Sequence, residues 1–193
     1  MTPRHLALLV TAGLIAASPA PAQPAPPPLQ ALPSLEVAPY MGTWYQVAWI
    51  PNRFQKQCVS DTAATYRDRG DGSVEVLNRC KLANGKLDDV LGVARPPVGV
   101  SRIEAGKLMP ARLEVSFLPA WLRWTGIGWG AYWVVDFAPD GRYAIISEAT
   151  REYLWVLARQ PALTPADDVA IKAKLQALGF DLARVQAHPH SPR

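Results

Sequence analysis

Two cysteines carry the greatest potential for covalent chemistry in this chain. Cys58 and Cys80 flank a turn signal at residues 70–72, so a hairpin that turns there places them on facing strands. Pairing them directly sets a register in which Ala64 lies opposite Val74. This spacing is compatible with a cross-strand disulfide, which the chain-entropy model values at roughly 3 kcal/mol. A nucleophilic thiol is the alternative, although neither cysteine has a histidine nearby in the sequence.

Other candidates for catalysis are few. His5 lies at the start of the chain, and His188 and His190 lie near its end, so the central part has no histidine for base catalysis, haem or zinc. The acids that could pair as acid and base lie on separate segments, and we interpret them as solvated surface charges: Glu75, Asp88, Asp89 and Glu148. We therefore expect no catalytic residue, no metal site and no cofactor, and we do not expect an enzyme.

Composition indicates one ordinary globular domain. Of the 193 residues, 49% are hydrophobic and 19% are charged, and the formal net charge is +4. The basic residues are scattered, whereas nucleic-acid binding needs a clustered basic stripe, so we expect no nucleic-acid partner. A peripheral contact with an anionic membrane surface stays open.

The first residues predict export. Residues 1–22 show a basic start, a short apolar run and a small-residue cleavage pattern at Ala20-Pro21-Ala22, as in a secretory signal peptide. A lipoprotein would need a cysteine at the cleavage point, and none precedes Cys58. Residues 23–39 are rich in proline and are expected to form a linker. We expect a periplasmic or secreted protein, with association with the outer membrane left open.

The rest of the chain reads mainly as β-strands. Turn signals such as Asn84-Gly85 and Pro139-Asp140-Gly141 separate segments rich in β-branched and aromatic residues. The eight predicted strands are 43–50, 58–68, 73–82, 86–95, 111–118, 130–138, 142–149 and 153–160. Successive strands with short turns favour an all-β fold, an eight-stranded antiparallel up-and-down barrel, which leaves no sheet edge exposed. Periodicity alone does not separate a barrel from a sandwich.

One helix follows the strands. Thr164 suits an N-cap, Pro165 suits the first turn and Gly179 suits the end. The predicted apolar face of this helix consists of Val169, Ile171, Leu175 and Leu178. A short strand at 182–187 completes a domain that spans 40–187, followed by a tail at 188–193, and residues 96–110 and 119–129 are expected to be long loops.

Three separated motifs resemble the signatures of the lipocalin family. Gly42-Thr43-Trp44-Tyr45 matches the G-x-W signature, residues 132–136 end in Asp136 like the second signature, and residues 153–159 end in Arg159 like the third. Within the family, residues 42–48 and 64–66 look most like the bacterial outer-membrane lipocalins and their apolipoprotein D-like relatives. The resemblance implies an eight-stranded barrel with a C-terminal helix. It also implies a cation–π contact between Trp44 and Arg159, and binding of a fatty acid or lysophospholipid.

Strand alternation selects the residues expected to line the barrel, because every second side chain of a strand faces inward. This set is mostly apolar with a few polar groups, as in small-molecule pockets, although plain core packing stays open for each member. The expected ligand-binding residues are Ala64, Tyr66, Val76, Asn78, Leu113, Val115, Phe117, Tyr132, Val134, Tyr153 and Trp155.

The expected function is reversible binding, storage or transport of a hydrophobic or amphipathic ligand in the cell envelope. Trp121, Trp124 and Trp129 lie close together and could form a lipid-contacting rim or fold back over the barrel. Two alternatives remain: a filled barrel that acts as a protein-interaction module, and a thiol-dependent lipocalin enzyme.

Overall fold

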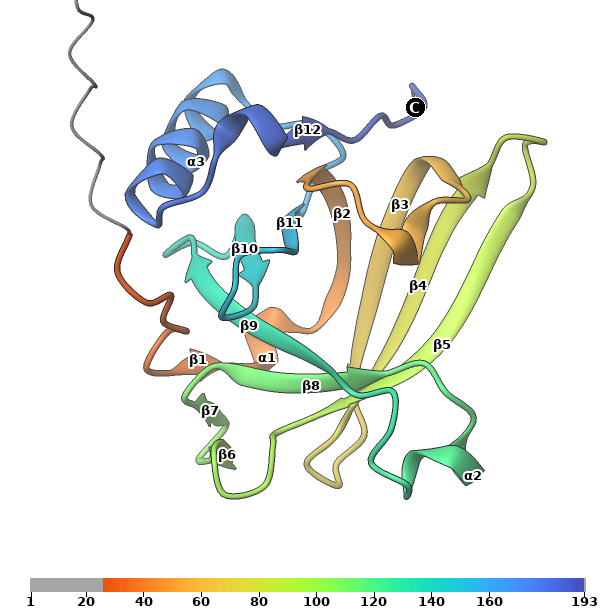
Figure 1. Ribbon diagram of the computed structural model, residues 1–193, viewed down its shortest axis with the longest axis vertical. Helices are drawn as coiled ribbons and strands as arrows, with labels where there is room; N and C mark the ends of the chain where they lie inside the picture. Colours follow the sequence, from red (N-terminus) through yellow and green to blue (C-terminus); the bar gives the residue numbers. More distant parts are fainter. Residues whose placement is uncertain (1–25, 193) are drawn as a thin grey trace, which may run out of the picture.

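The computed structural model describes residues 26–192, and the predicted signal peptide at 1–22 lies outside them. Eight antiparallel strands close into a barrel, because each pairs with its sequence neighbour and β11 also pairs with β2 (Figure 1). The barrel strands are β2 (Gly42–Trp49), β3 (Cys58–Asp68), β4 (Val74–Leu82), β5 (Leu87–Arg95), β8 (Arg112–Ser116), β9 (Gly130–Phe137), β10 (Tyr143–Ser147) and β11 (Leu154–Ala158). All eight predicted strands and the predicted barrel are confirmed.

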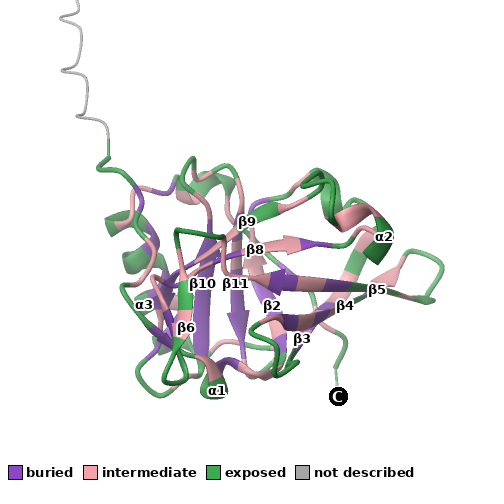
Figure 2. Cartoon of the chain, turned by 90° about the horizontal axis from the view of Figure 1, so that it is seen from below, coloured by how far each residue is buried: buried purple, intermediate pink, exposed green. Residues whose placement is uncertain are grey.

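Two apolar cores share the strands of the barrel. One fills the interior and includes Trp44, Tyr66 and Ile146. The other lies on the outer face of β9, β10 and β11, where it meets the helix α3 (Pro165–Ala177). Strands β10 and β11 face both cores, which is why their residues are buried almost throughout (Figure 2).

The helix α3 begins as predicted. The Thr164 side chain accepts a hydrogen bond from the Asp167 amide, and Gly179 follows the helix with a φ of +80°. Ile171 and Leu175 are buried against the barrel, but Val169 is 68% exposed, so its predicted place on the apolar face is wrong. Val169 and Ile171 are two positions apart, which places Val169 about 200° around the helix from Ile171, away from the core.

The end of the barrel that carries α1 (Val37–Tyr40) is closed by segments that the sequence analysis treats as linker and loop. β1 (Leu35–Glu36), β7 (Lys107–Met109) and β6 (Arg102–Glu104) form a small sheet beside α1. The expected linker at 23–39 and the expected long loop at 96–110 are corrected accordingly. Leu29 and Leu35 are apolar residues among the prolines and pack into the cores, and three-residue strands are too short to produce a recognisable pattern.

The disulfide between Cys58 and Cys80 is present, but the register of its hairpin differs from the predicted one. Ala64 pairs with Asn78, four positions from the expected Val74. Two irregularities in β3 near Ser60 allow the disulfide to form away from a direct cross-strand pair. Because the shift is an even number of residues, the inward face of each strand stays as predicted.

The predicted C-terminal strand and tail both pack on the barrel. After η2 (Leu182–Arg184), β12 (Gln186–Ala187) pairs with β2. The expected tail continues along the barrel, where the Asp61 amide donates to the Pro189 carbonyl and the Ser191 amide donates to the Asp61 carboxylate. Within residues 26–192, no helix is both long and apolar enough to cross a membrane.

Candidate functional site: the barrel interior and its mouth

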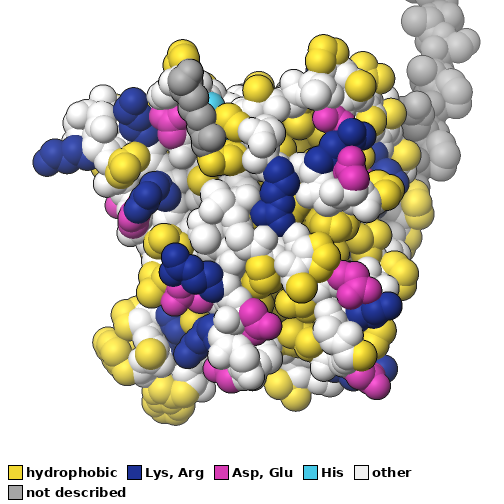
Figure 3. Space-filling view, turned by 180° about the vertical axis from the view of Figure 1, so that it is seen from behind, with side chains coloured by type: hydrophobic (Ala, Val, Ile, Leu, Met, Phe, Trp, Pro, Cys, Tyr) yellow, Lys and Arg dark blue, Asp and Glu magenta, His cyan; other side chains and the backbone are white. Residues whose placement is uncertain are grey.

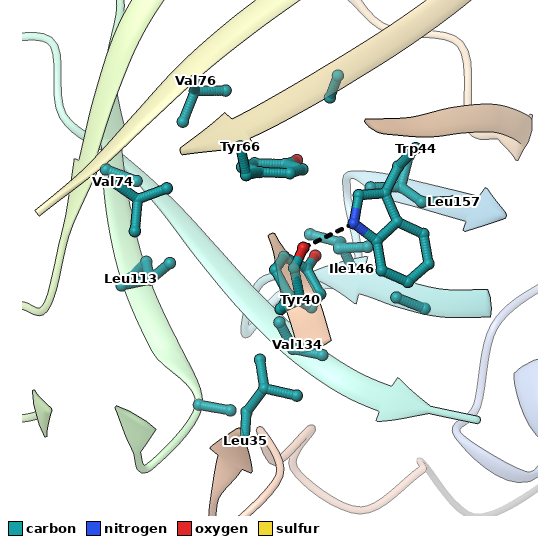
Figure 4. Packing of buried hydrophobic residues seen from close by; sticks show 14 of the residues in the cluster. Leu35, Tyr40, Trp44, Tyr66, Val74, Val76, Leu113, Val134, Ile146 and Leu157 are labelled. Atoms are coloured by element: carbon teal, nitrogen blue, oxygen red, sulfur yellow. Dashed lines mark hydrogen bonds between the residues drawn. The ribbon is translucent and has the colours of Figure 1, made fainter. Parts of the chain in front are cut away.

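The closed end of the barrel is built around Trp44. The indole of Trp44 is fully buried and donates a hydrogen bond to the Tyr40 carbonyl at 2.8 Å (Figure 4). The Arg159 guanidinium lies 3.7 Å from the centre of the Trp44 ring, which confirms the predicted contact. It also donates to the carbonyls of Pro39, Met41 and Thr43. Arg159 thereby links α1 to the end of β11. Trp44 and Arg159 both stabilise the fold.

Two further signature residues also support the fold. Gly42 has a φ of +90°, a conformation that favours glycine, and a Cβ there would lie 3.5 Å from the Arg159 side chain. The Asp136 carboxylate forms an ion pair with Lys174 of α3, with 3.0 Å between Oδ1 and Nζ. Asp136 therefore links β9 to the helix and does not contact the interior.

The structure brings most of the predicted ligand-binding residues together inside the barrel. Those in the buried interior core are Ala64, Tyr66, Val76, Leu113 and Val134, and those that pack against it while partly exposed are Val115, Tyr132 and Trp155. Asn78 lies on the same face of β4 as Val76 and is partly exposed. Its side chain forms no hydrogen bond within residues 26–192. Their role in binding a ligand stays a prediction.

Three tyrosine hydroxyls meet in the interior. The Tyr132 hydroxyl lies 2.6 Å from that of Tyr40 and 2.8 Å from that of Tyr66. Burial raises the pKa of Tyr66 to about 12 and raises the pKa values of Tyr40 and Tyr132 well above their usual value. The three phenols therefore stay protonated. Sequence analysis selected Tyr66 and Tyr132 but not Tyr40, which comes from α1 and not from a barrel strand.

A second polar network lies toward the mouth, the end formed by the connections at 50–57, 83–86, 117–129 and 148–153. The Gln55 amide donates to Gln46 at 2.9 Å and accepts from the Trp155 indole at 2.8 Å. Gln46 is 2% exposed, and its amide nitrogen has no hydrogen-bond partner. Sequence analysis missed both glutamines, since a loop residue that folds into a barrel leaves no periodic signal.

Apolar side chains form the wall next to this network. Phe117 is 37% exposed, and its ring occupies the space over Gly92, where a Cβ would lie 2.6 Å from the ring. Val90 pairs with Asn78 across β4 and β5 and is 43% exposed. Tyr153 stacks on Trp155 at 5.9 Å, at the rim of the barrel. Phe117 and Tyr153 thus lie at the mouth and not deep in the interior.

In the tryptophan-rich loop at 119–129, one part is exposed at the rim and another part folds back on the barrel, so each predicted arrangement holds for some of its residues. It contains the short helix α2 (Ala120–Arg123), and Trp121, Trp124 and Ile127 are 71%, 85% and 70% exposed. Apolar side chains gather over this segment at the lower left of Figure 3. Trp129 instead folds back, with the Arg95 guanidinium 3.9 Å from its ring centre.

Little in the described chain supports catalysis. Both cysteines form the disulfide, and no cluster of histidine, cysteine or acid suited to a metal lies within residues 26–192. Glu75 and Asp89 pair with arginines on the outer face, and Glu148 bonds to Thr150 in its own loop. Two hollows of about 270 Å³ each lie on the outer face around Ala63 and at the rim around Arg53.

Comparison with known proteins agrees with this architecture. A family model for a lipocalin-like domain matches residues 35–190. Temperature-induced lipocalin-1 of Arabidopsis thaliana is 32% identical over 84% of this chain and 83% of its own length. Outer membrane lipoprotein Blc of Escherichia coli K12 is 30% identical (75% and 73%), and apolipoprotein D of Mus musculus is 29% identical (82% and 78%). Among solved structures, lobster apocrustacyanin A1 aligns with a TM-score of 0.59 at 15% identity, over 80% of this chain and 79% of its own.

Proposed function

The chain belongs to the lipocalin family, which binds small hydrophobic ligands, and we propose that it binds and carries an acyl-chain amphiphile in the mouth half of its barrel. The observation that supports this is the set of inward side chains that stay partly exposed there. Val115, Tyr132, Trp155, Val90 and Phe117 form an apolar wall of this kind. Such a wall leaves apolar area to be removed from water by a ligand.

The mechanism is burial with few specific contacts. Each CH₂ group that leaves water contributes about 0.8 kcal/mol, so a long acyl chain gains affinity from an apolar wall alone. The amides of Asn78 and Gln46 supply hydrogen-bonding capacity that the protein itself leaves unused. Fatty acids and lysophospholipids are the ligands that we propose first, with the cell envelope as the place of action.

The proposed location rests on less evidence. One relative is named an outer membrane lipoprotein, and the N-terminal residues resemble a signal peptide. We propose an exported protein in the periplasm or the medium. Fractionation of cells that express the full chain tests this, and recovery of the uncleaved chain in the cytoplasm would contradict it.

The experiment that tests binding is mass spectrometry of organic extracts from the purified protein, together with titration of tryptophan fluorescence by lysophospholipid and fatty acid. Co-purified acyl lipid, or saturable quenching near one equivalent, is the expected result. Leu113→Trp would fill the interior and should abolish binding, whereas Leu87→Trp adds the same ring on the outer side, where Leu87 is 59% exposed. Absence of binding to the wild-type protein would favour a filled barrel that acts as a protein-interaction module.

We also propose that the loop at 119–129 contacts a membrane surface while a ligand is exchanged. Trp121 and Trp124 are the most exposed aromatic side chains at the mouth, and Arg123 lies between them. A Trp121→Ala, Trp124→Ala variant should lose binding to anionic vesicles. The matched control is Val98→Ala, Val100→Ala, which removes exposed apolar side chains from the connection between β5 and β6. Equal binding by all three proteins would reject the contact.

A further inference from the structure

The tyrosine cluster of Tyr40, Tyr66 and Tyr132 has one more hydroxyl proton than it has hydrogen bonds between its members. The three hydroxyls form a chain with Tyr132 in the middle, and that chain has two hydrogen bonds. Three protonated phenols carry three O–H protons, and each bond uses one of them. One O–H group therefore has no acceptor within residues 26–192.

The unused proton is best placed on Tyr132. Tyr40 and Tyr66 are 3% and 4% exposed, whereas Tyr132 is partly exposed and packs against the interior core from β9. If Tyr40 and Tyr66 both donate to the Tyr132 oxygen, the Tyr132 proton is the one left without an acceptor. Figure 4 shows Tyr40 and Tyr66 close to each other, with Trp44 to one side of them. A donor left unsatisfied in an apolar interior destabilises the protein, and a ligand acceptor would remove that penalty.

The charges around the interior restrict what that acceptor can be. The basic side chains of the barrel strands sit on the outward face, opposite in alternation to Tyr66, Val76, Ala94 and Leu113: Arg67, Arg79, Lys81, Arg95 and Arg112. The charged residue that shares the inward face near the mouth is an acid, Asp88, which pairs with Cys80 across β4 and β5. A carboxylate carried to the tyrosine cluster would lose its water, and Arg159, the cation that acts on Tyr40, is already held by the Trp44 ring and three backbone carbonyls.

We propose that the barrel holds an uncharged apolar molecule with one acceptor oxygen, a ketone, ester or alcohol, which enters oxygen first and accepts the Tyr132 hydroxyl proton. This inference rests on the proposed function and replaces the charged head group of its first-named ligands by an uncharged oxygen. A fatty acid that enters with its tail first would place a methyl group on the unused donor. An acyl chain with an uncharged oxygen at its leading end satisfies the donor and leaves its hydrocarbon along the apolar wall.

The test compares two ligands of similar length, 2-tridecanone and dodecanoate, by fluorescence titration at neutral pH. The wild-type protein should bind the ketone more tightly. Tyr132→Phe should weaken ketone binding by about tenfold, the effect of one neutral hydrogen bond, and change dodecanoate binding by less than about twofold. Tyr143→Phe is the matched control, because Tyr143 packs in the second core outside the barrel interior, and its ketone affinity should stay within about twofold of wild type.

A spectroscopic measurement separates recognition from a merely structural role of Tyr132. The infrared carbonyl band of bound ¹³C-labelled ketone should move to lower frequency in the wild type and in Tyr143→Phe, and return in Tyr132→Phe. Equal ketone and dodecanoate losses in Tyr132→Phe, or a preference of the wild type for dodecanoate, would overturn the inference while the proposed function stands. Failure of both probes and of lysophospholipid to bind the wild type would overturn both.

Discussion

Replacing Arg159 by methionine should destabilise the closed end of the barrel by about 2–3.5 kcal/mol. The guanidinium contributes a cation–π contact at 3.7 Å from the Trp44 ring centre, worth about 0.5–2 kcal/mol. Its three hydrogen bonds go to the carbonyls of Pro39, Met41 and Thr43. These carbonyls are partly exposed and regain water when the arginine is removed, so each bond is taken at about 0.5 kcal/mol, the low end of the usual range.

Urea unfolding followed by tryptophan fluorescence measures this loss directly. For a domain of this size, it corresponds to a fall in Tm of about 4–14 °C. Arg159→Lys keeps a cation but reaches fewer carbonyls, so about half of the loss should remain. Arg67→Met is the control, because Arg67 is 66% exposed and forms a surface ion pair with Glu75. Equal midpoints for Arg159→Met and Arg67→Met would refute the anchoring role of Arg159.

Three further predictions concern the disulfide, the mouth and the C-terminal tail. Replacing Cys58 and Cys80 by alanine should cost roughly 3 kcal/mol in urea unfolding, and a loss below about 1 kcal/mol would contradict the constraint on the unfolded chain. Gly92→Val should displace the Phe117 ring, because its Cβ would lie 2.6 Å from that ring, and should weaken ligand binding more than Gly85→Val, whose Cβ meets open space but whose φ is +81°. The pKa of His188 is lowered to about 4 by burial and by His190, so the folded state binds fewer protons than the unfolded state between pH 6.5 and 4. The free energy of unfolding should therefore decrease as the pH is lowered from 6.5 to 4, and this decrease should be smaller in His188→Gln. An unchanged pH profile of the urea midpoint in that variant would count against the role of His188.

The strands of the barrel were predictable because local signals mark them. Turn residues such as Asn84-Gly85 separate the strands, and alternation selects their inward faces. The predicted register of Ala64 was wrong, but an even shift preserves the side on which each residue lies. The interior residues could therefore be selected from the sequence even though their cross-strand neighbours could not.

The features that escaped prediction depend on contacts between distant segments. Gln55 folds inward from a loop because the Trp155 indole and Gln46 bind it. Tyr40 joins Tyr132 across 92 positions of the chain. Leu35 is buried because β7 offers it a partner strand, which a proline-rich composition conceals. The periodic pattern of one segment carries no information about its contacts with a distant segment.

The packing of residues 186–191 on the barrel sets a condition on the order of folding. The His188 ring accepts a hydrogen bond from the Thr62 amide, and the His190 ring forms one with the Gln46 carbonyl. The Ser191 amide donates to the Asp61 carboxylate. These pairs are 126 to 144 positions apart in the sequence. These late residues lie along β2 and β3, the first barrel strands to be synthesised. The contacts of residues 186–191 with β2 and β3 can therefore form only after all eight barrel strands have been synthesised.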